Sequence, residues 1–251
     1  VVDKATPVMN LTSVSAKYNG EPVPVNNPII AGTTTSQDLP YVAKYRGIGS
    51  TDYAETTVPP IDFGTYEAIV STNGDTNHYP VSAKTTISIG KNTPVMSLVG
   101  KTKVYDGTPL TMTATIVPSH LEISYIYQGV QKDGTIYDAS PQAPTEAGNY
   151  TVTASTKGDS NHSIASVSTE IEIMKTEANI AMNNKSAAFT GTPISIEKPI
   201  TEPIEAVLTI TYTGIGKTNY PESGQAPKNG GTYQVKAHFA GNNNYKPKQA
   251  T

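Results

Sequence analysis

The chain has no cysteine and no tryptophan, and it has only three phenylalanines among 251 residues. Without cysteine it can form neither disulfide bonds nor thiolate metal sites. Without tryptophan, and with so little phenylalanine, it must fill its hydrophobic cores with valine, isoleucine, alanine and tyrosine. We therefore expect small cores, as is usual for domains well below 100 residues.

Neither sign of charge dominates, because 18 basic residues face 21 acidic ones and the net charge is −3. No basic face stands out, so nucleic acid is not an expected partner. The sequence also contains no run of eighteen apolar residues and no signal-peptide pattern at Val1. We therefore expect that this segment does not insert into a membrane.

A strand that opens with Gly-x-Tyr and then alternates apolar and polar residues occurs three times, at Tyr66, Tyr150 and Tyr233, about 84 residues apart. A second landmark keeps the same period, with Tyr-Asn-Gly-Glu-Pro at 18–22, Tyr-Asp-Gly-Thr-Pro at 105–109 and Phe-Thr-Gly-Thr-Pro at 189–193. Landmarks in one order at one period indicate tandem repetition. We predict three repeats, 1–90, 91–174 and 175–251, and we expect the chain to be a piece of a longer protein.

The Gly-x-Tyr strands also predict the fold. A tyrosine at the start of a half-buried strand is typical of the tyrosine corner of immunoglobulin-like sandwiches, where its hydroxyl bonds back to the loop backbone. We therefore assign Tyr66, Tyr150 and Tyr233 a structural role. No segment has a sustained helical stripe, and each repeat holds about seven short strands separated by turns. The prediction is an all-β chain of tandem immunoglobulin-like β-sandwich domains.

Strands in the first repeat are expected near residues 8–11, 16–18, 23–30, 41–45, 53–57, 65–72 and 83–89. In the second repeat, Lys-Asp-Gly at 132–134 predicts a hairpin turn. The third repeat has no counterpart of the last strand after Gln249, so we expect that strand to be missing. Linkers between repeats are nearly absent, and three repeats end to end predict a monomeric rod of roughly 100 Å.

The motifs resemble the MBG-type repeats of bacterial cell-surface proteins, best in the second repeat and incompletely in the third. The resemblance rests on Lys-x-x-Pro, Tyr-Asp-Gly-Thr-Pro, Ala-Gly-Asn-Tyr-Thr-Val-Thr-Ala and Gly-Asp-Ser-Asn-His. It implies an extracellular stalk of a wall-anchored adhesin or of a secreted enzyme, in some cases with mucin or glycan binding. It implies no catalytic residue, and the first repeat departs from the pattern at 59–63. The absence of cysteine agrees with the exterior of a Gram-positive bacterium.

No nucleophile-elbow or phosphate-loop motif is present, so we expect neither an enzyme nor a cofactor. The four histidines, His78, His120, His162 and His238, are interpreted as solvated surface residues that hold no metal. The loops Gly-Asp-Thr-Asn at 74–77 and Gly-Asp-Ser-Asn at 158–161 could offer oxygens to calcium. Because Asp and Asn also cap turns through their own backbone, we favour the turn interpretation.

Fifteen tyrosines are a large share of the chain, and five of them are candidates for stacking on sugar rings. They are Tyr53, Tyr137 and Tyr220, which follow glycine-rich turns, and Tyr79 and Tyr245, which lie in the asparagine-rich loops. The competing interpretation, which we favour, is that they cover thin cores. The sequence thus predicts a structural spacer of an extracellular bacterial protein, and as the alternative a module that binds glycan or mucin through these tyrosines.

Overall fold

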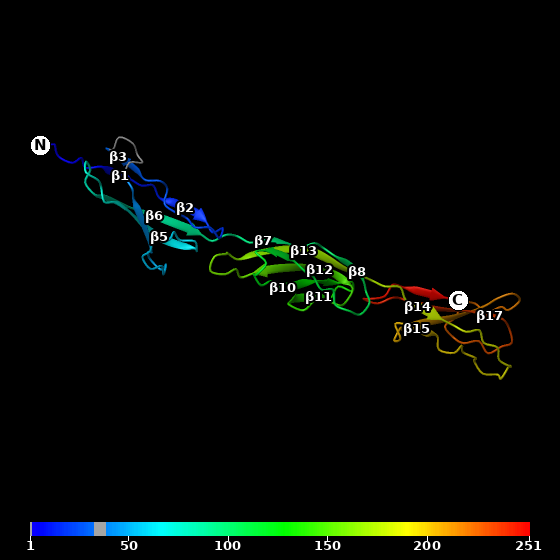
Figure 1. The fold of residues 1–251 in the computed structure, drawn as a ribbon. Coiled ribbons are helices and arrows are strands. Elements are labelled where there is room, and N and C mark those ends of the chain that lie inside the picture. The colour runs from blue at the N-terminus through cyan, green and yellow to red at the C-terminus, as the bar shows by residue number, and fades with distance from the viewer. Residues whose placement is uncertain (1, 33–38) are drawn as a thin grey trace. The chain divides into compact units, whose positions relative to one another are not determined.

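The computed structural model describes residues 2–32 and 39–251, and every regular element in them is a β-strand (Figure 1). The predicted all-β fold is confirmed, and no helix in these ranges could span a membrane. The chain divides into two compact units. Unit 1 comprises Val1–Met96, Thr115–Ile123 and Ser155–Ser166, and unit 2 comprises Ser97–Ala114, Ser124–Ala154 and Val167–Thr251. The second repeat contributes to both units.

In its described residues, 2–32 and 39–90, the first repeat contains six strands. They are β1 (Val8–Asn10), β2 (Val14–Lys17), β3 (Ile29–Ala31), β4 (Val42–Gly47), β5 (Gly64–Thr72) and β6 (Val81–Gly90). Strands β2, β6, β5 and β4 form one sheet in that order, and β1 pairs with β3 in a second sheet. β5 alternates strictly, so that its buried Tyr66 and Ala68 pack against the buried Ile87 and Ile89 of β6.

Two predicted strands of the first repeat are wrong or too long. Residues 53–57 form no strand and keep only an isolated bridge between Tyr45 and Thr56. The expected strand 23–30 is reduced to β3. Proline explains the second difference, since Pro24 and Pro28 lie within residues 23–30 and proline cannot donate a ladder hydrogen bond.

The second repeat has the most complete sheet. Its strands are β7 (Val95–Ser97), β8 (Thr102–Val104), β9 (Thr115–Val117), β10 (Ser124–Gln131), β11 (Ile136–Ser140), β12 (Gly148–Thr156) and β13 (Ala165–Met174). Five of them pair in the order β11-β10-β12-β13-β8, and β7 pairs with β9. The predicted hairpin turn between β10 and β11 is confirmed. Gly134 there adopts φ +91°, and the Gln131 amide donates to the Thr135 carbonyl over 2.9 Å.

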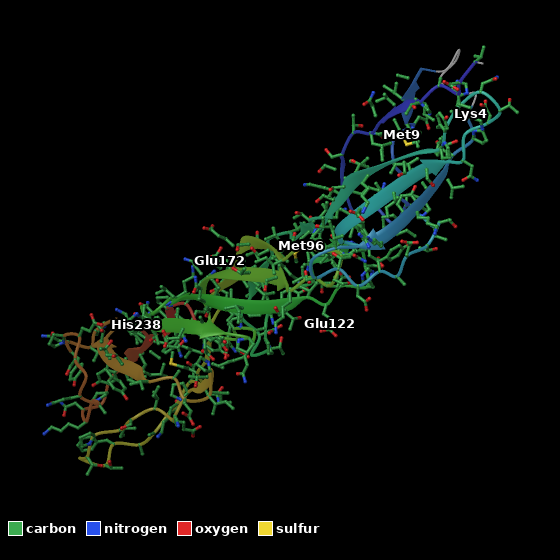
Figure 2. The ribbon with its side chains drawn as sticks, turned by 90° about the vertical axis from the view of Figure 1, so that its left-hand side faces the viewer. Lys4, Met9, Met96, Glu122, Glu172 and His238 are labelled. Carbon is green, nitrogen blue, oxygen red and sulfur yellow. The ribbon has the colours of Figure 1, made fainter. Side chains whose placement is uncertain are left out.

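The third repeat contains β14 (Asn179–Ala181), β15 (Ile200–Glu202), β16 (Leu208–Gly214), β17 (Tyr233–Phe239) and β18 (Lys248–Ala250). The expectation of a missing last strand is corrected in part, because β18 pairs antiparallel with the end of β17. β18 lies where β6 and β13 begin, whereas the later parts of those strands, Thr85–Ile89 and Ser168–Ile173, have no counterpart in the third repeat. Between the buried Ala237 and Phe239, His238 is exposed, as its alternation predicts (Figure 2).

Candidate functional site

Each Gly-x-Tyr strand begins with a tyrosine whose hydroxyl donates a hydrogen bond to the carbonyl four residues earlier. The three pairs are Tyr66 with Asp62 at 2.8 Å, Tyr150 with Glu146 at 2.7 Å and Tyr233 with Asn229 at 2.9 Å. This is the geometry of a tyrosine corner. Burial, and secondarily the charge of Glu146, raises the pKa of Tyr150 to about 12. The corner tyrosine therefore stays a neutral hydrogen-bond donor throughout the physiological pH range.

A second tyrosine supports each corner. Tyr53, Tyr137 and Tyr220 meet the corner rings edge to face, with ring centroids 5.4, 5.5 and 5.6 Å apart. Their hydroxyls donate to the carbonyls of Val58, Gln142 and Gln225, at 2.9, 2.9 and 2.8 Å. Edge-to-face pairs of this kind stabilise a core beyond their buried area. These three candidate sugar contacts therefore have packing and hydrogen-bond partners within their own repeats.

The other two candidate tyrosines differ from each other. Tyr79 is 47% exposed, and its backbone amide donates to the Ala5 carbonyl. Tyr245 is half-buried and packs edge to face against Tyr105, with the ring centroids 5.7 Å apart. Of the five, Tyr79 thus offers the most open aromatic surface.

The loop between β12 and β13 contacts the first repeat within unit 1, through its single asparagine. The Asn161 side chain accepts a hydrogen bond from the Phe63 amide and donates one to the Asp62 carboxylate, both over 2.9 Å. Lys91, the first residue of the second repeat, donates to the Asp159 carbonyl of this loop over 2.6 Å, and its ammonium lies 5.4 Å from the centre of the Phe63 ring in the first repeat. One amide thus holds the turn that carries the tyrosine corner of the preceding repeat.

The loop between β17 and β18 makes the equivalent contacts within unit 2. The Asn244 side chain accepts a hydrogen bond from the Ala147 amide over 2.9 Å and donates to the Glu146 carboxylate. Lys175, the first residue of the third repeat, donates to the Asn242 carbonyl of this loop over 2.7 Å, as Lys91 donates to the Asp159 carbonyl in unit 1. We call these two sets of contacts the junctions. An aromatic edge contact completes each one, Tyr18 with His162 and Tyr105 with Tyr245.

The loop between β12 and β13 is one of the two whose Asp-x-Asn triplet suggested calcium. The Asp159 carboxylate there accepts hydrogen bonds from the Asn161 and His162 backbone amides, and the Asn161 side chain turns to the preceding repeat. The bonds of Asp159 to its own loop backbone are those of the turn interpretation. One feature of the sequence does mark the junction loops. An asparagine ends the triplet in all three copies, at Asn77, Asn161 and Asn244, although the residue before it varies.

His162 is not a solvated surface residue, contrary to our interpretation of the histidines. It is only 6% exposed, and its Nδ1 lies 2.8 Å from Asp159 Oδ1. The other carboxylate oxygen of Asp159 lies 3.0 Å from Nε2 of His120. The bond from His120, with those from His162 and the loop amides, holds the pKa of Asp159 well below its usual range. The burial was missed because the Tyr18 ring that covers His162 belongs to the preceding repeat.

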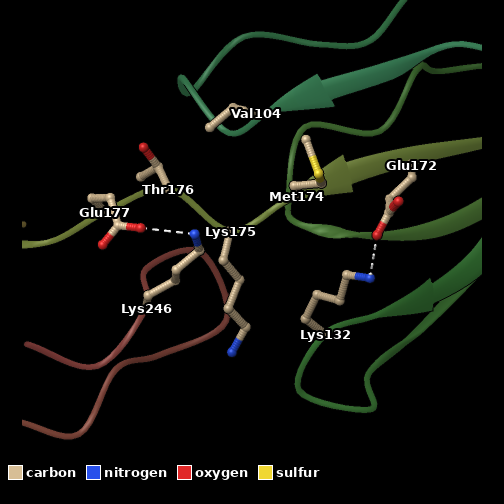
Figure 3. Close-up of a pocket in the computed structure, with 8 residues that line it drawn as sticks. All are labelled: Val104, Lys132, Glu172, Met174, Lys175, Thr176, Glu177 and Lys246. Atoms are coloured by element: carbon tan, nitrogen blue, oxygen red, sulfur yellow. Dashed lines mark hydrogen bonds and ion pairs between the residues drawn. The ribbon is translucent and has the colours of Figure 1, made fainter.

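A pocket of about 410 Å³ lies beside the junction in unit 2 (Figure 3). Its lining residues are Val104, Lys132, Glu172, Met174, Lys175, Thr176, Glu177 and Lys246. Lys132 pairs with Glu172 at 2.8 Å, and Lys246 pairs with Glu177 at 2.7 Å. Both carboxylates are thus neutralised by lysines, which favours a structural ion-pair cluster over acid–base chemistry.

A larger pocket of about 640 Å³ lies in the third repeat, between residues 182–196 and strands β16 and β17, with Thr251 at its edge. In the first two repeats the corresponding space holds the second half of β6 or β13. The buried side chains there are Ile87 and Ile89 in one repeat, and Ile171 and Ile173 in the other. The pocket therefore corresponds to a core position of this fold.

The sequence model of the MBG domain matches residues 95–177 and again 178–251, which together make up more than half of the chain. No curated protein matches this chain. Among solved structures, Drosophila N-cadherin EC1-4 is 16% identical with a TM-score of 0.29, and the match covers 68% of this chain and 50% of that one. Sidekick-1 immunoglobulin domains 1-5 are 12% identical with a TM-score of 0.28, and the match covers 97% and 57%.

The three N-terminal domains of the bacteriophage RB49 outer capsid protein Hoc are 14% identical, with a TM-score of 0.28 and coverage of 98% and 96%. The chain spans half the length of the cadherin chain that it matches.

Proposed function

Because this chain belongs to the MBG domain family, with two matched copies in tandem, we propose that it is a non-catalytic spacer of an extracellular bacterial protein. In such a role it separates a functional domain from the cell surface, or joins the modules of a secreted protein. The observation that carries the proposal is the junction. Equivalent asparagine and aromatic side chains join the first repeat to the second in unit 1 and the second to the third in unit 2.

A flexible linker would leave neighbouring domains free to rotate, as glycine- and serine-rich segments do. Here the last strand of the first repeat ends at Gly90, and by Asn92 the chain is already bridged to His162 in the loop of the second repeat. Such a short connection restricts the rotation of one repeat against the next. A spacer needs this restriction because it must hold the domains at its two ends apart.

Small-angle X-ray scattering of the intact chain tests this proposal. We expect a stiff, extended particle with a maximum dimension of roughly 100 Å, the length of three such repeats end to end. The same sample is applied to glycan and mucin arrays, where we expect no retention. A compact or broadly flexible particle would contradict the spacer.

The exposed ring of Tyr79 favours one second candidate, a glycan- or mucin-binding module. An exposed aromatic face can stack on a sugar ring. This function requires retention on the arrays and its loss in Tyr79→Ala, whereas Tyr53, Tyr137 and Tyr220 serve as controls because their rings already pack on the corner tyrosines. Retention that survives Tyr79→Ala would reject this assignment of the site.

A further inference from the structure

We propose that His120, Asp159 and His162 form a binding site for a divalent transition metal of the zinc type. One ligand atom from each of the three lies within 4.8 Å of the other two. Two imidazoles and one carboxylate are a common protein ligand set for zinc, which leaves a fourth position for water. Imidazole ligands favour zinc and its transition-metal neighbours, whereas calcium prefers oxygen.

The site is pre-organised by contacts that do not involve a metal. The Asn161 and His162 backbone amides hold the Asp159 carboxylate, at 2.8 and 2.7 Å. The His162 ring is buried and lies edge to face with Tyr18, with the ring centroids 5.3 Å apart. Such outer contacts fix the orientation of metal ligands and increase affinity.

An ion can reach the site from one side. The His120 side chain is 63% exposed on the loop that follows β9, while the His162 side chain is 7% exposed. The arrangement therefore combines a fixed inner ligand with an outer one that is open to solvent. A metal that enters would take the place of the hydrogens between Asp159 and the two imidazoles, and in each neutral imidazole the displaced hydrogen would move to the other ring nitrogen.

The third repeat indicates that the fold does not require these residue types. Asn242 and Tyr245 occupy the places of Asp159 and His162 there. The Asn242 side chain still accepts hydrogen bonds from the Asn244 and Tyr245 amides, at 2.9 and 2.8 Å. Tyr245 still makes the aromatic edge contact of the junction. An amide and a phenol are thus sufficient to hold this loop and to complete the junction. The carboxylate and imidazole of the second repeat are therefore available to bind a metal.

The test is isothermal titration of the tag-free, chelator-treated chain with zinc chloride, supported by the visible absorption spectrum of bound cobalt(II). We expect one tight equivalent and a cobalt spectrum of tetrahedral type. The main variant is Asp159→Asn with His162→Tyr, which installs the residues of the third repeat and keeps the junction. It should lose affinity by about 100-fold or more, since loss of even an outer-shell partner costs about 10–100-fold.

Two further variants make the result decisive. His120→Ala removes an exposed ligand without disturbing the core, and it should also abolish tight binding. His78→Ala removes the related pair with Asp75 in the first repeat, at 2.8 Å, and should leave the tight equivalent unchanged. The proposal is overturned if zinc produces no saturable heat, if binding survives His120→Ala, or if His78→Ala removes it.

Discussion

The hydroxyl of each corner tyrosine ties a strand to the loop before it. In the second repeat Tyr150 is almost fully buried, and its hydroxyl bonds the Glu146 carbonyl over 2.7 Å. Tyr150→Phe removes this donor and leaves the carbonyl without it. We expect the free energy of unfolding to fall by about 1–2 kcal/mol, as for other lost buried hydrogen bonds.

Urea unfolding followed by circular dichroism measures this change. Tyr137→Phe is the matched control, because its hydroxyl bonds the exposed Gln142 carbonyl and its loss should cost less. Equal costs for the two variants would show that the corner hydrogen bond has no special weight.

The same side chain predicts an alkaline limit of stability. Burial raises the pKa of Tyr150 to about 12, while an unfolded tyrosine ionises at about 10. The unfolded state therefore loses its proton first, so this stabilisation is complete below pH 10 and is lost as the pH rises toward 12. Unfolding measured at pH 9 and pH 11 should show a steeper fall for the native chain than for Tyr150→Phe. Parallel slopes would contradict the assignment.

Gly158 begins the junction loop of the second repeat at φ +69°, where a side chain is strained. A Cβ added there would lie 2.3 Å from the His162 carbonyl oxygen. Gly158→Ala should therefore cost about 1–2 kcal/mol for the backbone conformation and a further 1–3, roughly, for the clash. Gly107→Ala, at φ +78° with open space around it, isolates the first part. In thermal or urea unfolding, Gly158→Ala should be clearly less stable than Gly107→Ala.

The junction loops are elements whose main partner lies in another repeat. Asn161 contributes two hydrogen bonds to the turn at Asp62 and Phe63. Asn161→Ala should lower the free energy of unfolding by about 1–2 kcal/mol at typical values per bond. Asn77 occupies the same loop position in the first repeat, and in the described ranges its side chain has no such partner, so Asn77→Ala is the matched control. Equal effects of the two changes would show that the hydrogen bonds of Asn161 to the first repeat do not stabilise the chain.

The strands that alternate strictly could be predicted from the sequence, and the contacts between repeats could not. β5, β12 and β17 follow from Gly-x-Tyr and period-two alternation, because a strand buries one face. The junction depends on which turn meets which loop across about 100 positions of sequence, as for Phe63 and Asn161. The repeated asparagine marks the loop, but no local pattern encodes which turn it meets. The same reasoning explains His162, whose burial is completed by Tyr18 of the preceding repeat.

For the whole molecule, the junctions decide how far the repeats unfold together. The stability of a tandem array is about the sum of the intrinsic stabilities of its repeats and the terms for their interfaces. Of the main sheets of the three repeats, that of the third repeat is the smallest, with three strands in the order β16-β17-β18. It should therefore rely most on its neighbour, through Asn244 and the turn at Glu146 and Ala147.

Replacing Asn161 and Asn244 together by alanine should uncouple the repeats. Calorimetry should then show a broader transition, with a lower ratio of van't Hoff to calorimetric enthalpy than the native chain and an early component from the third repeat. Asn77→Ala supplies the control, since it changes the equivalent loop of the first repeat and leaves both junctions intact. If the double variant melted as sharply as the native chain, the side-chain contacts of the junctions would not couple the repeats. A spacer would then have to derive its stiffness from the short backbone connection at Gly90 and Met174, where β6 and β13 end.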